Sequence, residues 1–182
     1  MDEDHRGDDR ADPSTLPLDE LCSAILERHH AYLHGAIPVI RGWLSALPEP
    51  EAALPLLAEV RSVFGELADE MAGHLAKEEN ILFPALAAMA QAQRDGRNRP
   101  ALPFPTVVHP IRMMESEHAR IEGAMARLRA LTGNFAPPDG ASDSWRRGFR
   151  ELARLDEKLK AHLHAENDLL FPRALDLERQ LL

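Results

Sequence analysis

Four of the nine histidines recur along the chain at equal intervals, a pattern that could build a metal site. Steps of 44 residues separate His30, His74, His118 and His162. Two of them open closely similar segments 88 residues apart, HLAKEENILFP (74–84) and HLHAENDLLFP (162–172). Each segment carries a glutamate four residues after its histidine, Glu78 in the first and Glu166 in the second. Imidazole and carboxylate groups without thiolates suit Fe, Mn or Zn.

The His-x-x-x-Glu spacing places each pair on one face of a helix, because residues four apart lie about 40° apart around its axis. Leucines and a phenylalanine share that face, so we expect both pairs to point inward. In an up-down bundle, equal spacing returns the chain to a similar height, so the four histidines are predicted to meet in one layer of the core. His164 and Asp168 are also four residues apart, but neither belongs to the repeat.

Four imidazoles and two carboxylates in an apolar core would cost several kcal/mol for each group left without a partner. One interpretation is a buried His–Glu hydrogen-bond network, and the other is a metal site. The paired motifs and the regular spacing favour the metal site. Six donors divide naturally as two histidines for each of two ions, with Glu78 and Glu166 bridging, whereas a closed zinc site uses four ligands on one ion.

Long helices are needed to position these residues. Helical periodicity begins at Leu18 and predicts further helices over about 54–91, from near Pro110 to Leu128, and from about Trp145 to beyond Ala174. The connections at 94–105 and 132–144 are rich in Gly and Pro, and Ser142 or Asp143 is a candidate N-cap. No segment alternates apolar and polar residues as a strand does. The predicted fold is all-α, an up-down-up-down antiparallel four-helix bundle over 18–182.

Some details of this bundle are set by prolines and methionines. A turn is expected at Pro48 and Pro50, with Pro55 in the first turn of the second helix. Three other prolines are expected to interrupt or end helical runs, because proline lacks a backbone donor and crowds the preceding turn: Pro38, Pro84 and Pro172. Four methionines are expected to fill the core rather than to bind metal: Met71, Met113, Met114 and Met125.

Composition narrows the class of protein. The chain has 182 residues and a net charge of −9, so it lacks the positive field of a nucleic-acid-binding protein. No apolar run approaches the ~20 residues of a membrane span, and the N-terminus does not resemble a signal peptide. The only cysteine, Cys22, cannot form an intramolecular disulfide. Residues 1–17, acidic at their start, are expected to be a disordered tail, and the protein is expected to be cytoplasmic.

These motifs resemble the hemerythrin-like (HHE) domains, and among them the di-iron proteins that repair iron–sulfur clusters. The similarity covers about 19–175 and includes MESEHAR (114–120) and ERHHAYLHGAIP (27–38) besides the two His-x-x-x-Glu segments. The resemblance implies two Fe ions in an oxo-bridged centre, for which Zn or Mn are possible substitutes. The six implied ligands, with the two glutamates bridging, are His30, His74, Glu78, His118, His162 and Glu166.

The sequence departs from this family in ways that bear on function. Oxygen-carrying hemerythrins have a fifth histidine where this chain has Glu122, and they end in His-x4-Asp, where this chain has Asn167. Many repair proteins also have an N-terminal domain with adjacent cysteines, so a thiol partner would have to supply those groups here.

The resemblance implies repair of clusters damaged by oxidative or nitrosative stress, through iron release or handling of NO, O2 or peroxide. The partners would be such small ligands and damaged iron–sulfur proteins. One alternative is a protein that binds or senses O2 or NO without repair activity, and another is an oxidase or peroxidase. No catalytic side chain is assigned apart from the metal ligands.

Several neighbouring polar residues have two readings. His34 lies one turn from His30, Glu70 lies one turn before His74, and Glu117 is adjacent to His118. Each either orients a ligand from outside, as such groups often do, or is a solvated helix residue. His29 is predicted to lie at the boundary or on the surface, because it is about 100° around the helix from His30.

Overall fold

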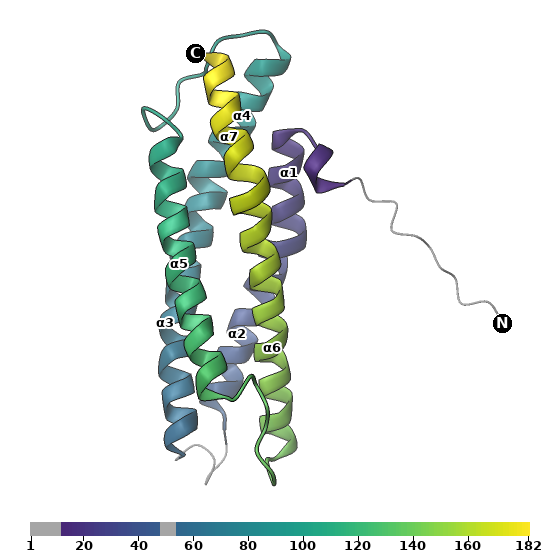
Figure 1. Ribbon diagram of the computed structural model, residues 1–182, viewed down its shortest axis with the longest axis vertical. Coiled ribbons are helices and arrows are strands. Elements are labelled where there is room, and N and C mark those ends of the chain that lie inside the picture. Colours follow the sequence, from purple (N-terminus) through teal and green to yellow (C-terminus); the bar gives the residue numbers. More distant parts are fainter. Residues whose placement is uncertain (1–11, 48–53) are drawn as a thin grey trace, which may run out of the picture.

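The computed structural model describes residues 12–47 and 54–182, which form long antiparallel helices and contain no strand (Figure 1). Four continuous rods cross the molecule, three of which contain a π-helical turn. In chain order their segments are α1 (Leu18–Ile25), η2 (Leu26–His30) and α2 (Ala31–Ser45); α3 (Pro55–Lys77), η4 (Glu78–Leu82) and α4 (Phe83–Arg94); α5 (Val108–Leu131); and α6 (Asp143–His164), η5 (Ala165–Leu170) and α7 (Phe171–Leu181).

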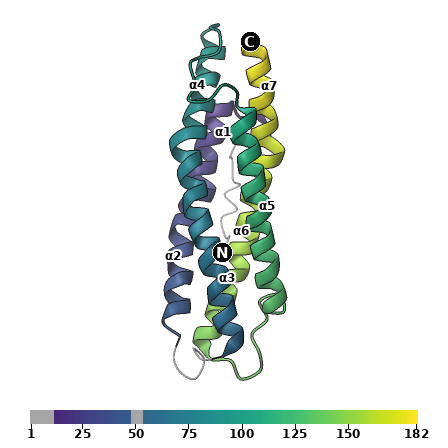
Figure 2. The same cartoon turned by 90° about the vertical axis from the view of Figure 1, so that its left-hand side faces the viewer.

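The rods alternate in direction, which confirms the predicted all-α, up-down-up-down bundle (Figures 1 and 2). At one end α2 packs against α3 and α6, and α3 packs against α5. At the other end α4 packs against α1 and α7. The bundle therefore brings the middle of each rod together, which is where the histidines of the 44-residue series lie.

Local signals in the sequence account for several helix starts. Asp19 and Glu20 lie in the first turn of α1, where acids favour the helix dipole. Pro55 is the first residue of α3, as predicted, whereas Pro48 and Pro50 lie outside the described residues. Of the two candidate caps of α6, Ser142 is the N-cap, and its Oγ accepts a hydrogen bond from the backbone N–H of Trp145 at 3.1 Å.

None of the prolines Pro38, Pro84 and Pro172 ends a rod, so that part of the prediction is wrong, although a π-helical turn interrupts the α-helix shortly before two of the three. Pro38 lies inside α2, and Pro84 and Pro172 each lie in the first turn of a helix that continues the rod. The π-helical turns η4 and η5 precede those two prolines, and each closes with a hydrogen bond from residue i to the carbonyl of i−5, Phe83 to Glu78 and Phe171 to Glu166. This wider turn lets the rod pass the proline without ending. All three π-helical turns contain residues of the predicted metal site.

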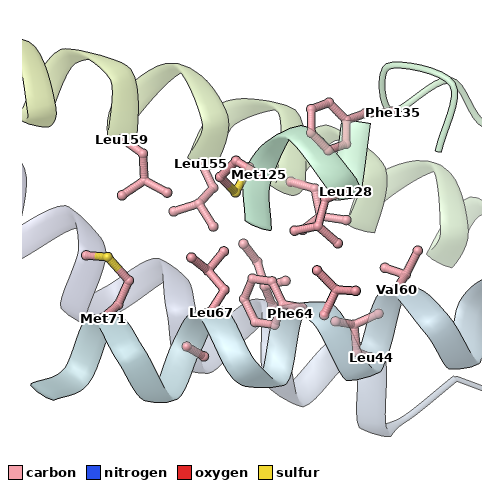
Figure 3. Close-up of a cluster of buried hydrophobic side chains, with 14 of the residues drawn as sticks. Leu44, Val60, Phe64, Leu67, Met71, Met125, Leu128, Phe135, Leu155 and Leu159 are labelled. Atoms are coloured by element: carbon pink, nitrogen blue, oxygen red, sulfur yellow. The ribbon is translucent and has the colours of Figure 1, made fainter. Parts of the chain in front are cut away.

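Two apolar clusters fill the bundle, one toward each end. The first contains residues of α2, α3, α5 and α6, including Phe64, Met71 and Met125 (Figure 3). The second contains residues of α1, α4 and α7 and the start of α5, including Met114. Three of the four methionines are thus in the core, as predicted. Met113 is 52% exposed, because its neighbour Met114 occupies the inward face of α5 at that turn.

Between the clusters each rod contributes polar residues. On the last rod, for example, Leu159 belongs to the first cluster and Leu170 to the second, and His162 and Glu166 lie between them. The same order holds on the second rod, where His74 and Glu78 lie between Met71 and Leu82. The predicted metal ligands therefore lie at the junction of two buried apolar clusters.

The predicted disordered tail covered residues 1–17. Of these, residues 1–11 lie outside the described residues, and Pro13–Thr15 form a short 3-10 helix whose N-cap is Asp12. Among the described helices, none combines the length and the apolar character needed to cross a membrane.

Candidate metal centre

The structure brings all six predicted ligands into one buried layer. His30 ends η2, His74 lies near the end of α3, and Glu78 begins η4. His118 lies in the middle of α5, His162 lies near the end of α6, and Glu166 follows in η5. Each of the six residues is at most 1% exposed. The layer therefore has one histidine from each rod and one glutamate from each of the two His-x-x-x-Glu motifs.

The donor atoms lie within a few ångströms of one another. Nε2 of His74 lies 3.3 Å from Oε2 of Glu78, and Nε2 of His118 lies 3.1 Å from Oε2 of Glu166. Nε2 of His30 lies between the carboxylates, 3.5 Å from Glu78 and 3.7 Å from Glu166. Two groups of four residues each place their donor atoms within 4.8 Å of one another: His74, His118, His162 and Glu166, and His30, Glu78, His162 and Glu166.

Buried donor atoms without hydrogen-bond partners are concentrated in this layer. Within the described chain, seven of the twelve such side-chain atoms belong to four of its residues: His30, Glu78, His162 and Glu166. Both carboxylates have two unpartnered oxygens. A buried polar atom with no partner costs about 1–3 kcal/mol, and a charged one costs more. Histidine nitrogens and carboxylate oxygens that face one another in this way fit metal ions as their missing partners.

The environment separates the pKa values of the two glutamates. Burial raises the pKa of Glu78, and the nearby Glu166 carboxylate raises it further. Burial also works to raise the pKa of Glu166, but the histidines around it, His162 and His118 among them, outweigh burial and lower that pKa. Burial lowers the pKa of His162 to about 3. The metal-free layer therefore holds neutral imidazole at His162 and opposes a second carboxylate charge, a mismatch that two cations would remove.

Three of the four histidines form a hydrogen bond through Nδ1 that points away from the centre. The Nδ1–H of His30 donates to Oε1 of Glu79 at 2.8 Å, and that of His74 donates to Oε2 of Glu117 at 3.0 Å. The Nδ1–H of His118 donates to Oδ1 of Asn167 at 2.8 Å. Because these oxygens accept the hydrogen bond, each bond fixes the proton on Nδ1 and leaves an unprotonated Nε2 facing the centre, where Nε2 of His74 and Nε2 of His118 lie 3.3 Å apart.

The two outer carboxylates are held in turn by groups nearer the surface. Nε2 of His34, an exposed residue, lies 2.7 Å from Oε1 of Glu79. Lys77 donates to Oε1 of Glu117. Partial burial works to raise the pKa of both carboxyls, but these hydrogen bonds and those from His30 and His74 lower it overall. Glu79 and Glu117 are therefore ionised at neutral pH.

An internal two-fold relation places both the six buried residues and their outer hydrogen-bond partners. Residues 88 apart occupy equivalent positions, so His30 corresponds to His118, and Glu79 corresponds to Asn167. The spacing from histidine to outer partner is 49 residues in both cases. The sequence alone did not indicate Glu79, because the repeat is defined by identical residues and the residue 88 positions after Glu79 is Asn167. The recurring 49-residue spacing was the signal that could have found it.

The other polar residues considered from the sequence differ in whether they contact this layer. His29 is half-buried, at the boundary that was one of its two predicted positions, and its ring centroid lies 6.0 Å from that of His162. Of the two acids weighed as outer partners, Glu117 contacts His74, whereas Glu70 pairs with Arg120 at 2.5 Å. His164 and Asp168, the pair outside the repeat, contact each other on the surface and take no part in the buried layer.

Two phenylalanines form apolar walls of the centre. The ring of Phe83 packs against His30 with 5.5 Å between centroids, and Phe171 stacks on His118 at 5.7 Å. These phenylalanines are also 88 residues apart and are at most 3% exposed. Together with the apolar clusters they keep bulk water from the donor atoms.

Known proteins show the same domain. The family described as hemerythrin HHE cation binding domain matches residues 23–174. The iron-sulfur cluster repair protein DnrN of Neisseria gonorrhoeae is 38% identical over 119 residues, which cover 65% of this chain and 68% of DnrN. The iron-sulfur cluster repair protein YtfE of Edwardsiella ictaluri is 31% identical over 173 residues (94% of this chain, 72% of YtfE), and that of Yersinia pseudotuberculosis is 31% identical over 164 (87% and 66%). This chain belongs to the hemerythrin HHE cation-binding domain family.

Proposed function

We propose that the protein is a non-haem di-iron protein that helps to restore iron–sulfur clusters damaged by oxidative or nitrosative stress. One observation carries this proposal: six buried donors face a common centre, four of them with atoms that have no hydrogen-bond partner within the described residues, in a chain similar to proteins named for cluster repair. The proposed ligands are His30, His74, Glu78, His118, His162 and Glu166, with the two glutamates bridging. Iron is proposed over zinc or manganese on the strength of those relatives.

The chain's own residues would prepare the site for two ions. Ring centroids lie 4.9 Å apart for His74 and His118, and 5.2 Å apart for His30 and His162, which favours one pair for each ion. Glu78 and Glu166 lie between the pairs and would neutralise part of the added charge. Iron bound there would supply one-electron chemistry and positions open to an exchangeable ligand.

A repair protein that delivers iron needs thiolates at the receiving cluster, and this chain does not offer one. Cys22, its only cysteine, is buried, and burial raises the pKa of its thiol to about 12. A thiol of that pKa is neither a good nucleophile nor a good metal ligand at neutral pH. We therefore propose that the damaged client or a separate thiol partner supplies these groups, in the reducing environment of the cytoplasm.

The test is to add purified, iron-loaded protein to an enzyme whose iron–sulfur cluster has been damaged by nitric oxide or peroxide, with a thiol present. Recovery of enzyme activity beyond that given by free ferrous iron and thiol supports repair. The matched variant is His74→Ala, which should give no recovery above that background. Equal recovery from the intact protein and from free iron would contradict the proposal.

The phenylalanine walls favour a second candidate function. An apolar, water-poor centre admits a neutral diatomic ligand more readily than a charged one, which suits a protein that binds or senses O2 or NO. A reversible spectral change with either gas, in protein that leaves damaged cluster enzymes inactive, would establish this alternative in place of repair.

A further inference from the structure

The outer partners of the four histidines break the two-fold relation of the centre. The inner ligands repeat faithfully 88 residues apart, His30 with His118, His74 with His162 and Glu78 with Glu166. The outer positions repeat in place and differ in charge. Glu79 behind His30 is matched by the neutral amide of Asn167 behind His118. Equivalent imidazoles thus have a carboxylate in one case and a neutral amide in the other, at the same distance of 2.8 Å, so the two positions differ in charge and not in geometry.

The outer positions behind His74 and His162 also differ in charge, with a carboxylate at one and a neutral residue at the other. Glu117 behind His74 corresponds to residue 29 on the first rod, and that residue is a histidine. The ring of His29 lies beside His162 with 6.0 Å between centroids, and within the described chain neither nitrogen of His162 has a hydrogen-bond partner. Burial lowers the pKa of His29, which keeps it uncharged. His162 therefore has no carboxylate behind it.

The carboxylates are distributed evenly over the two histidine pairs. The pair His30 and His162 includes one imidazole backed by Glu79, and the pair His74 and His118 includes one backed by Glu117. A carboxylate that accepts the Nδ1–H bond makes the opposite nitrogen a stronger donor and fixes the ring. An amide fixes the ring without the charge. Each pair thus combines one strengthened imidazole with one ordinary imidazole.

We propose that Glu79 and Glu117 are positioning residues that strengthen His30 and His74 as metal ligands, one for each ion, and thereby hold the reduction potential of the centre low. The proposal rests on the proposed di-iron site. His34 and Lys77 complete the arrangement, because their contacts from the surface side keep the two carboxylates aimed at the imidazoles. The contribution of each carboxylate is both orientation and charge, so a neutral acceptor of the same shape removes only the charge.

The test compares the wild type with Glu79→Gln and Glu117→Gln, loaded with ferrous iron. Each variant should bind iron about 10- to 100-fold more weakly in competition with a chelator, the usual effect of losing such a partner. Each should also raise the reduction potential, by ~59 mV if the one-electron equilibrium constant changes tenfold. Glu115→Gln is the matched control, since this exposed glutamate lies on the same helix as Glu117 and one turn before His118.

A substitution in the opposite direction makes the test independent of damage to the fold. Asn167→Asp keeps the shape of the side chain and places a carboxylate behind His118, so it should lower the reduction potential and slow the loss of iron. If Glu79→Gln and Glu117→Gln match Glu115→Gln in both measurements, or if Asn167→Asp raises the potential, the proposal is wrong. Failure of the wild type to bind two iron ions would instead overturn the di-iron site itself.

Discussion

Replacing Glu78 with methionine should stabilise the metal-free protein while it abolishes metal binding. Glu78 is fully buried, and neither of its carboxyl oxygens has a hydrogen-bond partner within the described residues. Oε2 of Glu78 lies 3.3 Å from Nε2 of His74 and 3.5 Å from Nε2 of His30. Burial raises the pKa of Glu78, and the carboxylate of Glu166 raises it further. Without metal, this side chain is a cost to folding rather than a support.

The magnitude follows from what the substitution removes. Because burial and Glu166 raise the pKa of Glu78, the substitution removes a buried polar group without hydrogen-bond partners in the described part of the chain, and such a group costs about 1–3 kcal/mol. Methionine is unbranched like glutamate and adapts to irregular space. We therefore expect the free energy of unfolding of the metal-free protein to rise by about 2 kcal/mol, or ~0.7 M in urea midpoint for a slope of ~3 kcal/mol/M.

A second buried glutamate provides the matched control. Glu178 is 6% exposed, and its carboxylate accepts hydrogen bonds from Thr106 Oγ1 at 2.6 Å and the backbone N–H of Val107 at 3.1 Å. Nε of Arg99 lies 2.9 Å from it. Glu178→Met leaves these donors without their acceptor, so it should destabilise the protein by about 3 kcal/mol. The same change in the same residue type is thus predicted to have opposite signs at two positions.

The assay is urea unfolding followed by circular dichroism, with the wild type and both variants stripped of metal by a chelator and then measured again with saturating ferrous iron. Iron should stabilise the wild type and the Glu178→Met variant, because it binds only the folded state, and it should leave the Glu78→Met variant unchanged. If Glu78→Met destabilises the metal-free protein as much as Glu178→Met does, the layer is a self-sufficient hydrogen-bond network and our reasoning is refuted.

Three further outcomes follow. His74→Ala should lower the iron content markedly, by metal analysis, while circular dichroism stays close to wild type. In the metal-free Glu78→Met variant, the neutral state of His162 contributes stability above pH 6.5, and this stability is lost as the pH falls toward 3 because the unfolded chain binds the proton first. With a folded pKa of about 3 for His162, urea unfolding should show a free energy of unfolding ~2 kcal/mol lower at pH 5 than at pH 8. Gly148→Ala should destabilise the protein by about 1–3 kcal/mol and shift tryptophan fluorescence, since its Cβ would lie 2.0 Å from the ring of Trp43, whereas Gly123→Ala meets nothing within 4 Å and should be neutral or stabilising.

The sequence was sufficient to predict the bundle and the inner layer, because both depend on periodicity. Helical spacing of apolar residues gave four long rods, and the equal steps from His30 to His162 gave the height at which the rods meet. These signals survive small changes in helix geometry. A π-helical turn adds one residue to a turn without moving the rod, so each histidine still reaches the same layer.

The details that were wrong or missed depend on contacts between rods. Pro84 and Pro172 do not end their helices, because the π-helical turns before them accommodate the missing donor, and no local pattern in the sequence announces such turns. Glu79 was missed and Glu117 was left with two readings, because they become outer partners only when other rods bring His30 and His74 beside them, 49 and 43 residues away in sequence. Met113 and Met114 are adjacent residues of the same type, and only the packing of α5 against its neighbours decides that Met114 is buried.

The most direct test of the central claim is a crystal structure of the iron-loaded protein with anomalous scattering measured at the iron edge. We expect two iron peaks in the buried layer, each bound by two of the four histidines and both in contact with Glu78 and Glu166. A single peak, or iron bound elsewhere while these imidazoles keep only the contacts described above, would contradict it.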